Sequence, residues 1–347
     1  MIELENKYKN TLNNFTFIDL FAGIGGFRYA FESFGAECVF TSEWDKQAQY
    51  IYKKNFGDEP SGDITQINEK EIPVHNILCG GFPCQAFSIS GKRLGFNDSR
   101  GTLFFDIARI AKYHKPEILF LENVKNFESH DNGRTLTTIK TVLNEIGYDI
   151  FYKVLNASNF GVPQKRERIY IIGFRKDLNV KKFKFPYPPN LPITIKDITL
   201  TDEEVQNYLI NRNDIKLKKD LVVNSDIFGN YPLEPIRVGT VNKGGQGERI
   251  YHEKGHAITL SAYGGGIGAK TGLYLINDKI RKLSPRECAR VQGFPDNFII
   301  HESNSQAYKQ FGNSVAINVL QYIIIEIIKW GKLNEYRRNE ELRVANC

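Results

Sequence analysis

The class of fold is decided by the stretch Phe17-Ile18-Asp19-Leu20-Phe21-Ala22-Gly23-Ile24-Gly25-Gly26. Its apolar first half predicts a buried strand, and Phe27, Ala30 and Phe31 then recur at helical spacing. The glycines between them let backbone N–H groups and a helix N-terminus approach a ligand closely, as a nucleotide-like cofactor requires. The stretch therefore predicts the first strand-turn-helix unit of an α/β fold. Because the spacing is not the full dinucleotide motif, a plain glycine turn is the alternative.

The next unit ends in an acidic and an aromatic residue. Residues 38–41 predict a second strand that ends at Glu43 and Trp44, and Asp45 is placed to cap a helix that runs to Phe56. An acid at the end of the second strand is where alternating α/β folds bind ribose hydroxyls, and Trp44 offers an aromatic face for adenine. The alternative is a solvated Glu43 beside a core Trp44.

Two further candidates are expected on loops. Asp63 can contact the adenine amino group, although shaping a turn is the commoner role of Asp. Residues 76–79 predict a third strand, and the two glycines after it let the backbone deliver Cys84 onto an exposed loop, where a nucleophilic thiol would be placed. The alternative is a packed cysteine, since free Cys is among the most buried residue types. Residues 86–100 lack periodicity and predict a mobile loop.

Later strands bring charged side chains to the same region. Residues 117–122 predict a strand buried on both faces, and Glu122 at its end needs a partner or a task because a desolvated carboxylate is costly. Active groups of open α/β sheets collect at such strand ends. Arg166 and Arg168 precede an apolar strand at 169–174, and alternation puts both arginines on one face, pointing to one site. A solvated basic edge is the alternative.

The composition changes in the second half of the chain. A proline-rich segment at 185–189 marks a linker, and residues 197–303 then lose the strand-helix alternation. This part contains glycine-dense loops at 242–249 and 262–268, which indicates a small β-rich domain. Residues 264–271 resemble a phosphate-binding P-loop, but the strand pattern that follows excludes one because a P-loop opens a helix.

These patterns predict two domains. Residues 1–196 and 304–347 form the larger, cofactor-binding domain, and residues 197–303 form the smaller domain with a hinge. An apolar helix that begins at residues 311–315 and runs to Trp330 packs back onto the larger domain.

The composition excludes several classes of protein. At 347 residues with 41% apolar content the chain can bury a full core, and its net charge of +6 permits a polyanionic partner. Five cysteines without a Cys-x-x-Cys pair argue against a disulfide framework and a zinc site, so we expect no metal and a cytoplasmic location. No apolar run approaches the roughly 20 residues of a membrane helix, and the charged residues 1–9 do not resemble a signal peptide.

Taken in this order, the motifs resemble the cytosine-5 DNA methyltransferase family. The motifs that carry the resemblance are Asp19-Leu20-Phe21-Ala22-Gly23-Ile24-Gly25-Gly26, Gly81-Phe82-Pro83-Cys84-Gln85, Glu122-Asn123-Val124, Gln164-Lys165-Arg166-Glu167-Arg168, Arg286-Glu287-Cys288-Ala289-Arg290 and Gly312-Asn313-Ser314-Val315. The likeness covers nearly the whole chain, and Pro-Cys followed by Glu-Asn-Val at this separation is highly specific. It is strongest to the GCGC-specific members and includes both glycine loops.

The resemblance implies a fold and a reaction. The fold is a Rossmann-like, S-adenosylmethionine-dependent methyltransferase sheet with a second, smaller β-rich target-recognition domain. The enzyme flips a cytosine out of duplex DNA, and Cys84 attacks C6 so that C5 can accept a methyl group. Glu122 is implied at N3 and the exocyclic amine, Arg168 at O2, and Arg166 in support of the loop.

The resemblance also implies binding residues and partners. The cofactor S-adenosylmethionine, which leaves as S-adenosylhomocysteine, is assigned to Phe21, Gly23, Gly25, Glu43, Trp44, Asp63, Ile64, Asn313 and Val315. The DNA is assigned to Ser90, Gln246, Arg249, Tyr263 and Gly266. We expect a monomer in the bacterial cytoplasm that methylates the first cytosine of GCGC beside a cognate restriction endonuclease, with no membrane partner.

Three other functions remain open at this point, besides the same reaction at another short DNA site. A transfer-RNA cytosine-5 methyltransferase would share the catalytic motifs, but the second domain of about 100 residues is sized like a duplex reader. A nicotinamide dehydrogenase would leave Cys84, Glu122 and Arg168 without a joint purpose. A catalytically dead DNA-binding module is opposed by the intact Cys84 and Glu122.

Overall fold

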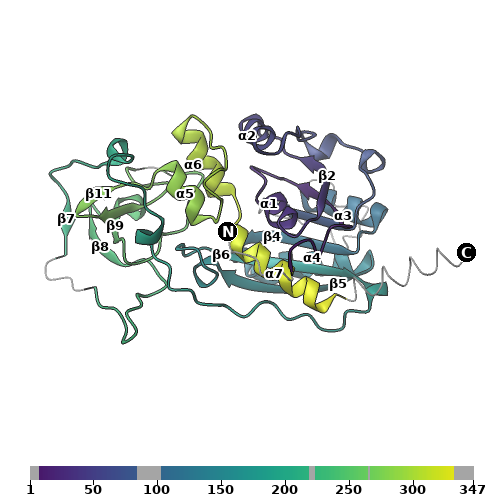
Figure 1. Cartoon of the computed structure of the whole chain (residues 1–347). Coiled ribbons are helices and arrows are strands. Elements are labelled where there is room, and N and C mark those ends of the chain that lie inside the picture. The colour runs from purple at the N-terminus through teal and green to yellow at the C-terminus, as the bar shows by residue number, and fades with distance from the viewer. Residues whose placement is uncertain (1–7, 84–102, 219–222, 265, 332–347) are drawn as a thin grey trace, which may run out of the picture.

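Two sheets of different size form the centres of two parts that lie side by side (Figure 1). The computed structural model describes residues 8–83, 103–218, 223–264 and 266–331. The larger part contains a six-stranded sheet and the smaller part a five-stranded sheet. The predicted α/β fold with a second, β-rich part is confirmed, whereas the domain boundaries at 196/197 and 303/304 stay a prediction.

The six-stranded sheet is mixed, with the order β2-β1-β3-β4-β6-β5. Its strands are β1 (Thr16–Leu20), β2 (Glu37–Ser42), β3 (Ile77–Gly81), β4 (Ile118–Val124), β5 (Tyr148–Asn156) and β6 (Glu167–Arg175). The first four are parallel, while β6 runs antiparallel to both β4 and β5. Because β4 is central, all of its residues are buried up to Asn123, as its apolar run predicted.

Helices cover both faces of this sheet. The seven α-helices are α1 (Gly26–Glu32), α2 (Lys46–Phe56), α3 (Leu103–His114), α4 (Arg134–Glu145), α5 (Pro285–Val291), α6 (Asn304–Asn313) and α7 (Ile317–Trp330) in the described residues. Strand side chains alternate, so Phe120 packs with α1 and α7 on one face while Leu119 packs with α3 and α4 on the other. The buried apolar area on both faces is the main favourable term in holding the layers together.

Helix α2 follows its sequence signals closely. Asp45 caps it by accepting the N–H groups of Gln47 and Ala48, and Gly57 ends it in the left-handed conformation at φ +83°. These contacts are local, which is why the bounds of α2 could be predicted. The position of Glu43 and Trp44 immediately before α2 is fixed by the same cap.

The apolar C-terminal helix does not begin where its sequence suggested. Residues 311–313 are the last turn of α6, the chain is extended at Ser314 and Ala316, and α7 begins only at Ile317. The final carbonyls of an α-helix lack hydrogen-bond partners within the helix. At the end of α6 the Arg166 guanidinium supplies partners, because it donates hydrogen bonds to the Gly312 and Ser314 carbonyls. The prediction of one helix from residues 311–315 onward was therefore wrong.

The stretch Asn304–Trp330 also bears on the expectation that no segment could span a membrane. This stretch is long enough and apolar enough to cross a membrane, but 78% of its most apolar 18-residue segment is buried inside the protein. In the chain it serves as a core element, which packs against α1.

The five-stranded sheet has the order β11-β10-β9-β8-β7. Its strands are β7 (Lys216–Leu217), β8 (Arg237–Thr240), β9 (Arg249–His252), β10 (Leu273–Ile276) and β11 (Lys279–Arg281). The strand β10 follows residues 264–271, so the rejection of a P-loop is confirmed. The two glycine loops touch, because the Gly268 N–H donates to the Gly247 carbonyl at 2.8 Å.

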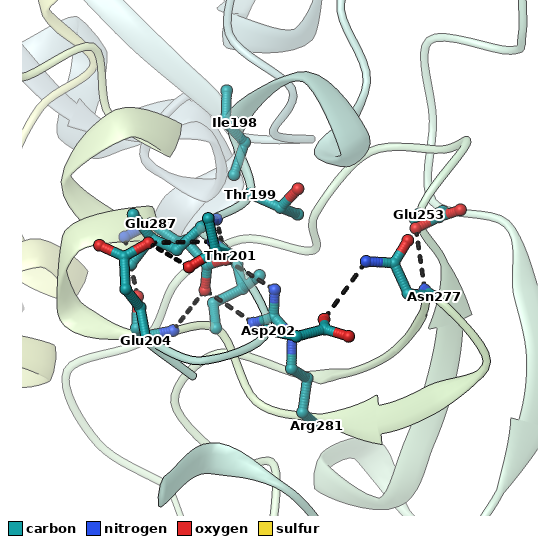
Figure 2. A network of polar contacts seen from close by, with 12 residues as sticks. Ile198, Thr199, Thr201, Asp202, Glu204, Glu253, Asn277, Arg281 and Glu287 are labelled. Carbon is teal, nitrogen blue, oxygen red and sulfur yellow. Dashed lines mark hydrogen bonds and ion pairs between the residues drawn. The ribbon is translucent and has the colours of Figure 1, made fainter. Parts of the chain in front are cut away.

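A buried ion pair fixes the segment that leads into the small sheet (Figure 2). Arg281 donates two hydrogen bonds to Glu287 at 2.7 and 2.8 Å, and both side chains are almost completely buried. Glu287 also accepts the backbone N–H of Leu200 at 3.0 Å and that of Ser284 at 2.7 Å. The chain segment at Leu200 is thus hydrogen-bonded to the first turn of α5.

Candidate active site

Four elements of the larger part meet at the carboxyl ends of the parallel strands. A Cβ added to Gly81, at the end of β3, would lie 3.4 Å from Glu122 Oε2 and 3.8 Å from Val315 Cγ1. A Cβ on Gly26, at the start of α1, would lie only 2.5 Å from Val315 Cγ2. The glycine turn, β3, β4 and the α6–α7 junction therefore lie next to one another, at the strand ends where active groups of open α/β sheets are expected.

Glu122 is a buried carboxylic acid at the end of β4. Its Oε1 lies 3.1 Å from Nε of Arg168, which pairs across the strands with Val124. Burial raises the pKa of Glu122 above its ordinary value, while the charges of Arg168 and Arg166 oppose the rise. A carboxyl group held in this balance can keep or share a proton and donate it to a ring nitrogen.

Arg166 is buried among backbone carbonyls. It donates to the Gly312 carbonyl at 3.3 Å, to the Ser314 carbonyl, and to Leu260 at 3.4 Å, which belongs to the second glycine loop region. Burial and the charge of Arg168 lower its pKa, and Glu122 opposes this shift. Arg166 thus joins the α6–α7 junction to the smaller part and lies close enough to Glu122 for their charges to interact, while its support of the loop stays a prediction.

Cys84 and Ser90 lie outside the described residues, as does the predicted loop at 86–100. The chain that leads to Cys84 is nevertheless held beside Glu122. The Asn123 amide donates to the Phe82 carbonyl at 2.9 Å, and Phe82 itself is buried. The end of β3 is therefore fastened to the end of β4.

Glu43 and the glycine turn form one unit. Glu43 Oε2 accepts the N–H of Gly23 and Oε1 accepts the N–H of Asp45, each at 2.8 Å. Gly23 and Gly25 have positive φ, and so does Phe21 at φ +58°, which is a strained conformation for an aromatic residue. A strained backbone held by its surroundings is typical of a binding site.

The open side of this unit suits a nucleoside. A Cβ on Gly23 would meet nothing within 4 Å, and Trp44 is 76% exposed, so the turn faces free space with an aromatic wall beside it. Asp63 caps a short helical turn by accepting the Thr65 N–H at 3.0 Å, which is the turn role weighed as its alternative, and Ile64 is buried. The residues around the turn therefore fit S-adenosylmethionine, with Asn313 exposed and Val315 buried at the far side.

A cavity of about 430 Å³ lies between the two parts. Its walls include Val124, Lys125, Arg168, Arg249, Tyr251 and Thr259. Nε of Arg249 is buried and has no hydrogen-bond partner among the described residues. The structure thus brings Arg249 to the same cavity as Arg168, for which a catalytic role was predicted.

The other predicted DNA-binding residues lie on the glycine loops. Tyr263 is 72% exposed, Gly266 has φ +98°, and Gln246 begins a short helical turn at Gln246–Glu248. Sequence reasoning missed two polar features outside the glycine loops, namely the Arg281–Glu287 ion pair between β11 and α5 and the side chain of Lys309. The Arg281–Glu287 pair could have been found from Ser284 and Glu287, which form a capping box, whereas Lys309 on α6 carried no local signal.

Charged side chains that could hold a metal ion are not grouped in the part of the chain that the structure describes. Within residues 8–83, 103–218, 223–264 and 266–331 no three His, Cys, Asp or Glu side chains are arranged for this purpose.

The mixed sheet, the glycine turn and the buried Glu–Arg pair define an α/β methyltransferase. The C-5 cytosine-specific DNA methylase family matches residues 15–329, and the chain belongs to this family, which uses S-adenosylmethionine to methylate cytosine in DNA. The family excludes the dehydrogenase considered above.

Known relatives agree with this assignment. The type II methyltransferase M.HhaI of Haemophilus parahaemolyticus is 61% identical over 94% of this chain and 97% of its own length. The type II methyltransferase M.HpaII of Haemophilus parainfluenzae is 47% identical over 90% and 88%. In fold, the chain is similar to the S. pombe Dnmt2 methyltransferase, with a TM-score of 0.66, 21% identity, and 90% of this chain and 98% of that chain covered.

Proposed function

We propose that this chain is the modification enzyme of a type II restriction-modification system and methylates the first cytosine of GCGC at C5. The observation that carries the catalytic part is the buried Glu122–Arg168 pair, in which Arg168 lines the same cavity as Arg249. The target is supported by the likeness to M.HhaI, which extends over 94% of the chain. The alternatives are the same reaction at another short DNA site and methylation of cytosine in transfer RNA.

The chemistry follows from the poor nucleophilicity of cytosine C5. The Cys84 thiolate adds to C6, which pushes electrons into the ring. Glu122 holds N3 and the exocyclic amine, and Arg168 holds O2, so that the negative charge that develops on the ring is stabilised. When bound, S-adenosylmethionine supplies the methyl group from its sulfonium. Loss of the C5 proton and departure of Cys84 then restore the aromatic ring.

The base must leave the helix before these residues can reach it. Flipping costs a few kcal/mol, and we assign Ser90 and Gln246 to fill the gap that the base leaves. Arg249, Tyr263 and Gly266 are assigned to the flanking bases, since a major groove presents a distinct pattern of donors and acceptors at each base pair.

The remaining features of the proposal concern the surroundings of the enzyme. We propose that it acts as a monomer in the bacterial cytoplasm, without a metal, and that it releases S-adenosylhomocysteine. A cognate restriction endonuclease that acts on the same site would be its partner in the cell.

The proposal is tested by modifying plasmid DNA with the purified protein and sequencing it after bisulfite treatment. Protected cytosines are expected at the first cytosine of GCGC, and a Cys84→Ser variant should leave none. Protection at another DNA site would correct the target alone. Methylation of transfer RNA without methylation of duplex DNA would overturn the proposal.

A further inference from the structure

We propose that Lys309 is a positioning residue for S-adenosylmethionine, which acts through Asp45 to keep the Glu43 carboxylate available to the ribose hydroxyls. The inference rests on the proposed cofactor site, in which Glu43 binds the ribose. Lys309 lies on α6, more than 260 positions after Asp45 in the chain, so no local pattern in the sequence joins them.

Lys309, Asp45 and Glu43 form a continuous series of contacts, in which the last contact is made by the Asp45 backbone. Nζ of Lys309 lies 2.7 Å from Asp45 Oδ2, while Asp45 Oδ1 accepts the Gln47 N–H at the start of α2. The backbone N–H of Asp45 donates to Glu43 Oε1 at 2.8 Å. Asp45 is thus held by Lys309 on one side and presents its N–H to Glu43 on the other.

Electrostatics gives Lys309 a second effect on Glu43. Glu43 is buried, which raises its pKa, and the N–H groups of Asp45 and Gly23 oppose the rise, whereas the charge of Asp45 adds to it. Burial acts to raise the pKa of Asp45, but the hydrogen bond from Lys309, the Gln47 N–H and the charge of Lys309 together lower it, so Asp45 is ionised. The positive charge of Lys309 beside Asp45 partly cancels the negative charge that Asp45 exerts on Glu43, and it also interacts with Glu43 itself. Without Lys309 the charge of Asp45 would disfavour the ionised form of Glu43.

Other ionisable groups also lie near this set. Asp19 on β1 is close enough to Glu43 for their charges to interact, and Tyr263 of the second glycine loop is close to Lys309. Neither is changed in the experiment below, so their contributions are the same in every variant. Binding is measured without DNA, which keeps Tyr263 out of contact with its proposed ligand.

The seam between α2 and the 299–310 region supplies a matched control. Lys54 forms an ion pair with Glu302 across the same seam, but the pair is exposed and joins no residue of the cofactor site. Lys309 and Asp45 are less exposed, at 31% and 24% of their side-chain surfaces. Replacing either lysine removes one positive charge from the seam, but only Lys309 pairs with a residue, Asp45, that contacts Glu43.

The test measures binding of S-adenosylhomocysteine by titration calorimetry. Lys309→Met should weaken binding about threefold to fivefold, the range of a partly exposed ion pair, and Lys54→Met should not. The pH midpoint below which binding is lost should move upward in Lys309→Met, because Glu43 then protonates at higher pH. Lys309→Arg should bind as the wild type does, and thermal unfolding of each variant checks that it is folded.

A second substitution shows whether Lys309 acts through Asp45. Asp45→Asn keeps the helix cap but removes the charge, so Lys309→Met should weaken binding less in that background, where only the direct interaction between Lys309 and Glu43 is left to lose. An equal loss of binding in both backgrounds would overturn the inference. If Glu43→Gln weakens binding and Lys309→Met does not, only this inference fails, whereas unchanged binding in Glu43→Gln contradicts the proposed cofactor site itself.

Discussion

At the scale of single residues, two carboxyl groups are buried for different reasons. Glu122 lies at the end of β4 and has Arg168, which lines the cavity, as a partner at 3.1 Å. Asp19 is completely buried under the glycine turn, where burial outweighs the nearby Arg28 and raises its pKa to about 8. The first arrangement is typical of a catalytic group, and the second carries a cost in stability that depends on pH.

Glu122→Gln should lower the turnover number by about 10²- to 10⁴-fold, the usual size of a general acid–base contribution. Gln has nearly the same shape, but it cannot carry a titratable proton to N3 and leaves Arg168 without a charged partner. Single-turnover methylation of a GCGC duplex measures the loss, and calorimetry with S-adenosylhomocysteine should show unchanged cofactor binding. A variant with turnover within twofold of the wild type would refute the role of Glu122.

Asp19→Asn should raise the free energy of unfolding relative to the wild type, and by more as the pH increases. An unfolded Asp ionises near pH 3.9, whereas the buried Asp19 keeps its proton to about pH 8. Between these values the folded state binds the extra proton, so the wild type loses stability as the pH rises, and Asn has no such loss. Urea unfolding at pH 5 and pH 8 measures the difference.

Asp45→Asn is the matched control for Asp19→Asn, because the pKa of Asp45 is shifted in the opposite direction and its substitution should change the free energy of unfolding with the opposite sign. The pKa of Asp45 is lowered in the folded state, so its contribution is present at neutral pH and lost in acid. Asp45→Asn should therefore be less stable than the wild type at pH 8. The same trend with pH in both variants would contradict the assignment for Asp19.

At the scale of elements, the junction of α6 and α7 is where distant parts of the chain meet. Gly312 at the end of α6 packs directly on the second glycine loop region, since a Cβ at this position would lie 2.2 Å from the Ala262 nitrogen. Arg166 contacts both this junction and the smaller part, because it donates hydrogen bonds to the carbonyls of Gly312 and Leu260. The junction therefore holds the two sheets in their relative positions.

Gly312→Ala should destabilise the protein by about 1–3 kcal/mol, as overpacking typically does. The atoms that it would strike, at Ser261 and Ala262, are backbone and cannot turn aside. Gly245→Ala is the control, because its Cβ would meet only the flexible end of Glu248 at 3.3 Å. Urea unfolding of both variants is the measurement, and equal stability of the two would contradict this account.

The limits of sequence reasoning follow from the range of the contacts. The bounds of α2 were predicted because Asp45 and Gly57 act on their own helix. The strand ends that carry Glu43 and Glu122 were predicted because a parallel sheet gathers them at one edge. The break between α6 and α7 was missed because it depends on Arg166, and the pair Asp45–Lys309 was missed because it joins helices far apart in the chain.

At the scale of the whole molecule, the two sheets share an apolar core and leave a polar cavity between them. Tyr251 and Tyr274 of the smaller part belong to the same buried cluster as Phe311 and Val319. The two parts are therefore joined by a packed apolar interface as well as by the connecting chain. The cavity beside this interface is lined by Arg249 and Arg168. We expect the bound DNA to lie against this cavity, with the smaller part supplying sequence recognition.

Arg249→Gln should lower the preference for GCGC duplex over a mutated site by roughly tenfold to a hundredfold, which corresponds to one bidentate base contact. Arg249 is half-buried in the wall of the cavity, which places its side chain where a base edge can approach it. Lys182→Gln is the control, because Lys182 is exposed outside the cavity and has the same charge. Competition binding at several salt concentrations separates the two effects, since a lost phosphate contact weakens all duplexes alike and lowers the salt dependence. An equal loss of affinity for both duplexes in Arg249→Gln would mean that Arg249 contacts phosphate, and sequence recognition would then have to be assigned to other residues of the glycine loops.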